Sequence, residues 1–249
     1  MKACLSIKRD LIVLWDEAWF AFAGFTPTYR RRTTMATAKR LKARYRSEAY
    51  AAEYNVYQAR IADLNDDDLL NERLMPDPAL VRIRAYATQS THKSLTSLRQ
   101  GSMIHVHDQD FNQKVNAPFT EAFMTHTSTS PNYQILASLD IGRRQVELEG
   151  FEMVQKQIEL AMVIRERVAS HPLLSRYFRF LSAKDMIPDE YRPSGISNYF
   201  DSETGWKNNG MEEAWAQDDF VIDPSRLTLY LGKTGIDGDT FKNCLLYTS

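Results

Sequence analysis

Residues 11–17 read Leu-Ile-Val-Leu-Trp-Asp-Glu, and this stretch decides the fold because five apolar residues in a row precede two carboxylates. A run this short and this rich in branched side chains predicts a buried strand of a parallel sheet. In open α/β sheets, ligands bind outside the carboxyl ends of the strands. The sequence therefore predicts an α/β fold, with Asp16 placed where a strand delivers a functional carboxylate.

The segments that follow predict further elements of such a fold. Ala, Lys, Arg and Glu dominate residues 35–64, and Tyr50, Tyr54, Tyr57 and Ile61 recur there at helical spacing. We expect one or two helices that end near an acidic turn at residues 66–68, within a helical insert of about residues 35–75. Two strands are expected after it, a half-exposed one at residues 81–88 and another at residues 102–106.

The longest helical pattern in the chain runs over residues 138–170, and it contains no proline. We place a domain boundary near residue 145, which gives residues 1–145 and 146–249. After the helix we expect short strands at residues 177–181 and 227–231, a Gly/Asn-rich stretch at residues 194–210, and a helix opening after Asp237.

Composition and charge exclude some classes of function but do not identify one. The 249 residues are 43% hydrophobic and 25% charged, as in globular proteins, and the formal net charge is −1. An argument for nucleic-acid or membrane binding from whole-chain charge therefore fails. The two cysteines, Cys4 and Cys244, form no metal-type spacing, so we expect a reducing, cytoplasmic location. The basic residues between Lys39 and Arg46 favour a solvated helix face, with a nucleic-acid binder as the alternative.

Asp16, Trp19 and the turn Ser90-Thr91-His92-Lys93 could together carry chemistry. A pyridoxal-phosphate enzyme needs a lysine amine for a Schiff base, and a carboxylate to keep the pyridine nitrogen protonated. It also needs hydroxyls and amides that bind the phosphate. Each residue alone has an ordinary explanation, since a turn lysine is usually solvated and an aspartate after a strand is often a helix cap. The hypothesis depends on their combination.

Four blocks carry a resemblance to a known family. They are Asp-Glu-Ala-Trp-Phe at residues 16–20, Ala-Thr-Gln-Ser-Thr-His-Lys-Ser-Leu at 87–95, Gln-Gly-Ser-Met-Ile-His-Val at 100–106 and Ala-Phe-Met-Thr-His-Thr-Ser-Thr-Ser-Pro at 122–131. In sequence and in order, they resemble the large bacterial ornithine/lysine/arginine decarboxylases. The resemblance implies a partial large domain of the aspartate aminotransferase type (pyridoxal-phosphate fold type I), followed by part of a small α+β domain. It also implies that the chain is an internal fragment.

The resemblance implies a role for each matching residue. Lys93 matches the Schiff-base lysine, Asp16 the carboxylate at the pyridine nitrogen, and Trp19 an active-site aromatic residue. Ser90 and His92 match residues at the cofactor phosphate and its surroundings, and His92 is also a candidate catalytic residue. Ser128 and Ser130 match hydroxyls that reach the cofactor site of a neighbouring subunit.

The implied reaction is decarboxylation of arginine, lysine or ornithine to an amine and carbon dioxide, with pyridoxal phosphate as cofactor and a homodimer or larger self-assembly. Transamination on the same cofactor and a catalytically inactive interaction module of the same fold are the alternatives. His105 and His107 could lie on one strand face as metal ligands, but no third ligand is evident, so we expect no metal. Which basic amino acid is used stays open.

Overall fold

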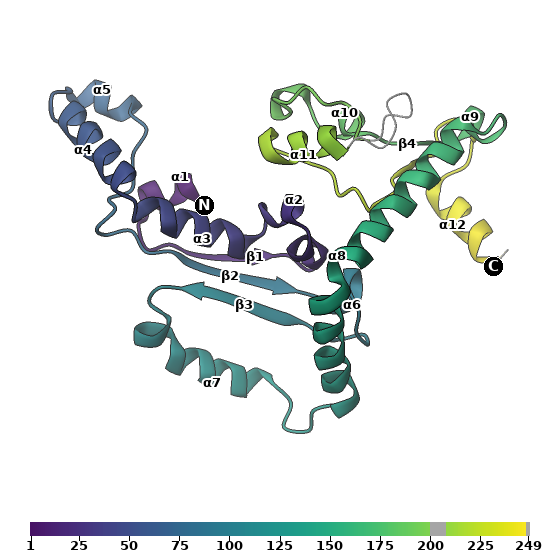
Figure 1. Cartoon of the computed structure of the whole chain (residues 1–249), viewed down its shortest axis with the longest axis horizontal. Coiled ribbons are helices and arrows are strands. Elements are labelled where there is room, and N and C mark those ends of the chain that lie inside the picture. The colour runs from purple at the N-terminus through teal and green to yellow at the C-terminus, as the bar shows by residue number, and fades with distance from the viewer. Residues whose placement is uncertain (200–207, 248–249) are drawn as a thin grey trace. The chain divides into compact units, whose positions relative to one another are not determined.

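The computed structural model describes residues 1–199 and 208–247 (Figure 1). Its contacts divide the chain into two compact units, Met1–Leu148 and Glu149–Ser249. The division falls inside one long helix, α8 (Tyr133–Ser170). The predicted long helix is therefore confirmed, and it begins at Tyr133 rather than at Ser138.

A three-stranded sheet organises the first unit, in the order β1-β2-β3. Its strands are β1 (Ile12–Asp16), β2 (Arg84–Gln89) and β3 (Met103–Asp108). β1 runs parallel to β2, and β3 runs antiparallel to β2, as Figure 1 shows. The three strands predicted from the sequence are thus confirmed.

The burial expected of β1 is wrong, whereas the alternation expected over residues 81–88 is largely confirmed. Ile12, Leu14 and Trp15 of β1 are 52%, 68% and 56% exposed, because β1 lies at the edge of the three-stranded sheet. β2 is the central strand, and its predicted covered face is buried, with Ala85 and Ala87 fully so. On the opposite face Arg84 and Thr88 are half-buried, and only Tyr86 departs from the prediction by being buried. Sequence alternation records the pleat of a strand, whereas the position of the strand in the sheet decides how much of it is covered.

Of the helices between β1 and β2, the last three each begin at a polar cap. They are α3 (Thr34–Tyr45), α4 (Glu48–Ala62) and α5 (Asp66–Asn71), capped by the side chains of Thr33, Ser47 and Asn65. The acidic turn predicted at residues 66–68 is wrong, since these three aspartates form the first turn of α5. Negative charge at a helix N-terminus is stabilising because it complements the helix dipole.

The core of the first unit lies between α3 and the sheet. α3 packs against β2 and β3. The buried residues of this cluster are Leu5, Ala38, Tyr45, Tyr50, Val81, Ile83 and Ala85. Tyr50 also donates its hydroxyl to the carbonyl oxygen of Pro76 at 2.8 Å, which ties α4 to the segment that leads into β2.

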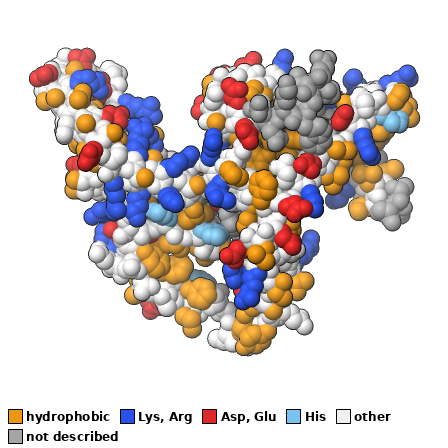
Figure 2. All heavy atoms as spheres, viewed as in Figure 1, with side chains coloured by type: hydrophobic (Ala, Val, Ile, Leu, Met, Phe, Trp, Pro, Cys, Tyr) orange, Lys and Arg blue, Asp and Glu red, His pale blue; other side chains and the backbone are white. Residues whose placement is uncertain are grey.

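The remaining elements of the first unit are short, apart from α7. They are α1 (Lys2–Ile7), the 3-10 helix η1 (Ala21–Phe25), α2 (Pro27–Arg30), α6 (Thr91–Ser94), the π-helix η2 (Phe111–Val115) and α7 (Asn116–His126). Figure 2 shows hydrophobic side chains gathered along the side of the sheet on which α7 lies. The basic side chains of α3 are largely exposed, with Tyr45 turned into the core instead.

The second unit contains short elements around the C-terminal half of α8. They are α9 (Leu174–Tyr177), β4 (Arg179–Phe180), α10 (Ala183–Met186), η3 (Asp189–Tyr191), α11 (Asn208–Gln217), β5 (Leu229–Tyr230) and α12 (Gly238–Tyr247). The two predicted strands exist but are only two residues long, and they pair antiparallel. The predicted helix after Asp237 is confirmed, whereas residues 200–207 of the Gly/Asn-rich stretch lie outside the described residues.

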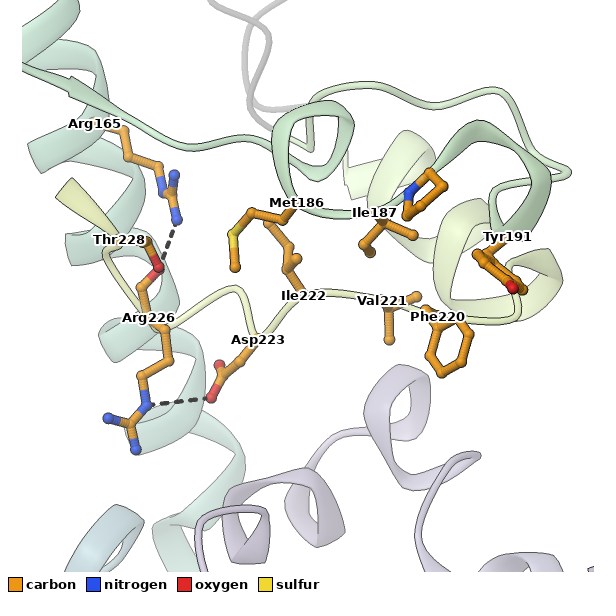
Figure 3. A pocket seen from close by; sticks show the side chains of 11 residues that line it. Arg165, Met186, Ile187, Tyr191, Phe220, Val221, Ile222, Asp223, Arg226 and Thr228 are labelled. Atoms are coloured by element: carbon orange, nitrogen blue, oxygen red, sulfur yellow. Dashed lines mark hydrogen bonds and ion pairs between the residues drawn. The ribbon is translucent and has the colours of Figure 1, made fainter. Parts of the chain in front are cut away.

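A cavity of about 630 Å³ lies within this second unit (Figure 3). Its wall is mostly apolar, with Met186, Ile222 and Phe220 on it. Arg165, on the cavity wall, is bonded to backbone, since its Nη2 donates to the carbonyl oxygen of Arg226 at 2.6 Å.

Within residues 1–199 and 208–247, no helix has the length and apolar character needed to cross a membrane.

Candidate functional site

The candidate site lies at the carboxyl ends of the parallel strands β1 and β2. Asp16 is the last residue of β1 and stands in register with Thr88 of β2. The amide of Glu17 donates to the carbonyl oxygen of Thr88 at 2.9 Å, so the two strands remain joined as they end. β2 ends at Gln89, and the turn that contains Lys93 follows at once. Parallel pairing thus brings two segments more than 70 residues apart to one edge of the sheet.

Lys93 and Trp19 face each other at this edge. The Lys93 ammonium nitrogen lies 5.1 Å from the centre of the Trp19 ring, a cation–π distance. Both side chains are exposed, and Trp19 is 52% exposed. The amide of Lys93 donates to the carbonyl oxygen of Ser90 at 3.3 Å. The backbone of Lys93 is therefore fixed by a hydrogen bond, while its side-chain amine stays accessible to solvent.

Asp16 presents an accessible carboxylate beside these residues. Its Oδ1 accepts the amide of Ala18 at 2.9 Å, which closes a tight turn directly after β1. Ala18 in turn accepts the amide of Ser90 at 3.4 Å through its carbonyl oxygen. The carboxylate is exposed, so it can meet a ligand at little desolvation cost.

Ser90 and His92 belong to the same turn as Lys93. Ser90 is the N-cap residue of α6, yet its hydroxyl makes no capping hydrogen bond. The Nδ1 atom of His92 lies 3.0 Å from the carbonyl oxygen of Gly101, and a carbonyl only accepts, so Nδ1 donates. The Nε2 atom of a neutral His92 ring is then an acceptor. The structure thus gathers Asp16, Trp19, Ser90, His92 and Lys93 into one region.

Ser128 and Ser130 are not part of this group. Both are exposed in the segment between α7 and α8, and the amide of Ser130 donates to Ser128 Oγ at 3.1 Å. Among the described residues, their hydrogen bonds are local and none reaches the Lys93 turn. Their assignment to a neighbouring subunit's cofactor site stays a prediction.

A buried carboxylate, Glu17, supports the site, and sequence reasoning left it without a role. Glu17 is 2% exposed and accepts hydrogen bonds from the amide of Thr34 at 2.6 Å and from Gln89 Nε2 at 2.9 Å. Gln89 Oε1 in turn lies 3.0 Å from His105 Nε2. The only signal in the sequence was a second carboxylate directly after the apolar run.

Two backbone features near Lys93 were also missed. Gln100, three residues before β3, adopts a positive φ of 72°, a conformation that favours glycine. Gly142 of α8 approaches the backbone of Thr96 so closely that a Cβ there would overlap the Thr96 carbonyl oxygen. Close packing of α8 therefore fixes the segment that follows Lys93.

His105 and His107 are two apart on β3, as a shared face requires, but they differ in their surroundings. His105 bonds Gln89, whereas His107 Nε2 is buried without a hydrogen-bond partner. Burial lowers the pKa of His107, because it disfavours the charged ring. Among the residues that the structure describes, no group of three or more His, Cys, Asp or Glu could hold a metal ion.

Comparison with known proteins assigns the family. Residues 77–244 match the model of the Orn/Lys/Arg decarboxylase family, major domain, and this match covers more than half of the chain. The chain belongs to the Orn/Lys/Arg decarboxylase family. The resemblance seen in the four sequence blocks is thereby confirmed.

Two relatives show how much of a family member this chain represents. It is 33% identical over 160 residues to a lysine decarboxylase of Pseudomonas aeruginosa, covering 64% of this chain and 16% of that protein. It is 29% identical over 163 residues to the constitutive ornithine decarboxylase of Escherichia coli, covering 62% of this chain and 22% of that protein. The chain therefore spans less than a quarter of the length of either relative.

A solved structure supports the fold. The constitutive lysine decarboxylase of Escherichia coli matches 98% of this chain and 33% of its own chain, with a TM-score of 0.51 at 19% identity. At that identity the likeness concerns the fold alone. The α/β fold expected from the sequence is thus confirmed as part of a decarboxylase domain of this family.

Proposed function

We propose that this chain carries the cofactor-anchoring part of a pyridoxal-phosphate-dependent decarboxylase of basic amino acids, with Lys93 as the anchoring lysine. One observation carries the proposal: Asp16 and Lys93 lie at the carboxyl ends of two adjacent parallel strands. Family membership supports it, since relatives decarboxylate lysine, ornithine or arginine according to their names.

The residues present fit such a cofactor in charge and chemistry. An exposed carboxylate, Asp16, suits a protonated ring nitrogen, and an exposed amine, Lys93, suits an aldehyde. The hydroxyl of Ser94 is buried without a hydrogen-bond partner, and Ser90 leaves its hydroxyl out of the helix cap. Two hydroxyls beside the lysine are thus free of protein partners, as oxygens that await a phosphate would be.

When bound, pyridoxal phosphate supplies an electron-withdrawing ring that accepts the electron pair left when carbon dioxide departs. Asp16 would keep a proton on the ring nitrogen through its carboxylate. Trp19 would stack near the bound cofactor and limit the access of water to Lys93. Lys93 would hold the cofactor through its side-chain amine, and the same amine would hold or move a proton beside the substrate. His92 would orient its Nε2 toward bound groups, because Gly101 holds its Nδ1.

Assembly is part of the proposal. The exposed serines Ser128 and Ser130 would complete the site of a second copy, so that a homodimer or larger assembly carries the activity. Basic amino acids are the proposed substrates, and a cytoplasmic location is proposed with them.

The test is a visible absorbance spectrum of the purified chain with pyridoxal phosphate, before and after borohydride. We expect an absorbance band from a covalent adduct, and a peptide containing Lys93 that carries the reduced cofactor in mass spectrometry. Lys93→Ala should lack both. Lys39→Ala, which removes an exposed lysine of α3, should keep both.

The proposal is wrong if the adduct forms equally in Lys93→Ala, or if it forms only on other lysines. Product analysis after incubation with arginine, lysine and ornithine then separates decarboxylation from transamination. Release of carbon dioxide with an amine supports the first, and a keto acid supports the second.

A further inference from the structure

We propose that Glu17 is a positioning residue. It joins the C-terminal end of β1 to the C-terminal end of β2, and so fixes the positions of Asp16 and Lys93 relative to each other. The proposal rests on the proposed function, because it concerns the same site. Glu17 itself does not reach the exposed face of that site, since its side chain is buried.

The two oxygens of Glu17 each bind a different element. Oε1 accepts the amide of Thr34, the first residue of α3, at 2.6 Å. Oε2 accepts Gln89 Nε2, at the end of β2, at 2.9 Å. A buried carboxylate is costly unless both oxygens are bonded, and here both are. The side chain therefore joins the sheet edge to the N-terminus of a 12-residue helix.

The helix end makes this carboxylate favourable. The first amides of a helix have no partner within the helix, and the helix dipole favours negative charge there. The side chain of Thr33 caps the amide of Ala36, and Glu17 takes the amide of Thr34. Charge-assisted bonds of this kind are stronger than neutral ones, so the position of Glu17 is well defined.

Backbone contacts of Glu17 also constrain its neighbours Asp16 and Trp19. Glu17 directly follows Asp16, and its own amide is bonded to Thr88 of β2 at 2.9 Å. Its carbonyl oxygen accepts the amide of Phe20 at 2.8 Å, which fixes the turn that carries Trp19.

The link continues on the β2 side. Gln89 immediately precedes Ser90, whose carbonyl oxygen accepts the amide of Lys93 at 3.3 Å. Gln89 is held on its other side by His105 Nε2 at 3.0 Å. The hydrogen bonds Thr34–Glu17–Gln89–His105 therefore link α3, through the end of β2, to β3.

Hydrogen exchange of backbone amides tests this link without any cofactor. We would compare wild type with Glu17→Met and Gln89→Met, which keep side-chain volume and remove the bonds. Loss of a charge-assisted bond predicts exchange faster by about tenfold or more at the amides of residues 18–20 and 90–93. Tyr50→Phe is the matched control, because it removes a buried bond elsewhere in the same unit.

The second readout is the affinity of the cofactor adduct on Lys93, measured from its absorbance band. Both Met variants should weaken it about tenfold, and Tyr50→Phe should leave it unchanged. The positioning role is wrong if exchange at residues 90–93 is unchanged in both folded Met variants, or if adduct affinity stays at the wild-type value. It is also wrong if Tyr50→Phe gives the same pattern.

These outcomes separate the two proposals. If exchange accelerates as expected but wild type forms no adduct on Lys93, the proposed function fails and the structural link of Glu17 stands. If wild type forms the adduct and exchange does not respond, the proposed function stands and the positioning role fails.

Discussion

Replacing Gly142 by alanine should destabilise the first unit although it improves helix propensity. Gly142 is buried in α8, and a Cβ there would overlap the carbonyl oxygen of Thr96 and lie 3.1 Å from its carbon and 3.2 Å from its Oγ1. Thr96 follows Lys93 by three residues. Because the obstacle is backbone, it cannot rotate away, and either α8 or the Lys93 segment must shift.

The magnitude follows from two opposing terms. Overpacking of a filled site costs about 1–3 kcal/mol. Replacing a helix-interior glycine by alanine returns about 1 kcal/mol. Because the Cβ would overlap a backbone oxygen, the overpacking cost lies at the upper end of this range, and we expect a net loss of about 2 kcal/mol in the free energy of unfolding. The accommodating shift should also displace Lys93 and weaken the proposed cofactor adduct.

Urea unfolding followed by tryptophan fluorescence and circular dichroism measures the effect. Gly210→Ala in α11 is the matched control, because the nearest atom to its Cβ would be Ile196 Cδ1 at 4.0 Å. That variant should be as stable as wild type or gain up to about 1 kcal/mol. The reasoning is refuted if Gly142→Ala is as stable as wild type, since the close approach of α8 would then not constrain the molecule.

Two further predictions concern ion pairs. The side chain of Asp108 is fully buried, and both of its oxygens accept from Arg84 Nε at 3.1 Å. Asp108→Leu should leave the largely buried guanidinium of Arg84 without this carboxylate and cost about 3–5 kcal/mol in urea unfolding; a loss below about 1 kcal/mol would contradict this. The backbone amide of Ser182, followed by Arg179, lowers the pKa of Asp185 to about 2. The ionised Asp185 therefore stabilises the fold at pH values above the ordinary carboxyl pKa. This stabilisation is lost as the pH falls through about 2. Asp185→Asn should thus cost about 1–2 kcal/mol at pH 7 after solvent screening, and almost nothing near pH 2. A cost independent of pH would show that the charge plays no part.

The sequence predicted the elements of the site better than their surroundings. The apolar run before Asp16 predicted β1, and the Ser/Thr-rich turn predicted where Lys93 lies relative to β2. Parallel strands place their carboxyl ends at one edge, so the meeting of Asp16 and Lys93 was predictable from local patterns. The same patterns misjudged the burial of β1, because β1 proved to be an edge strand of the sheet.

Contacts distant in sequence could not be predicted in the same way. Glu17 bonds Thr34, 17 residues on, and Gln89, 72 residues on, and no periodicity encodes either pair. The close approach of Gly142 to Thr96 is likewise a property of helix packing. A lone carboxylate or glycine has the same local appearance in a solvated turn as in a buried one.

The sequence by itself determined the family, the α/β class and the long helix, because these depend on local patterning and on motif identity. Only the tertiary structure decided which strand is central and that Asp66–Asp68 begin a helix. It also decided that a buried Glu17 joins the end of β1 to the end of β2. Burial and pairing are set by which elements pack together, and that is a property of the folded chain as a whole.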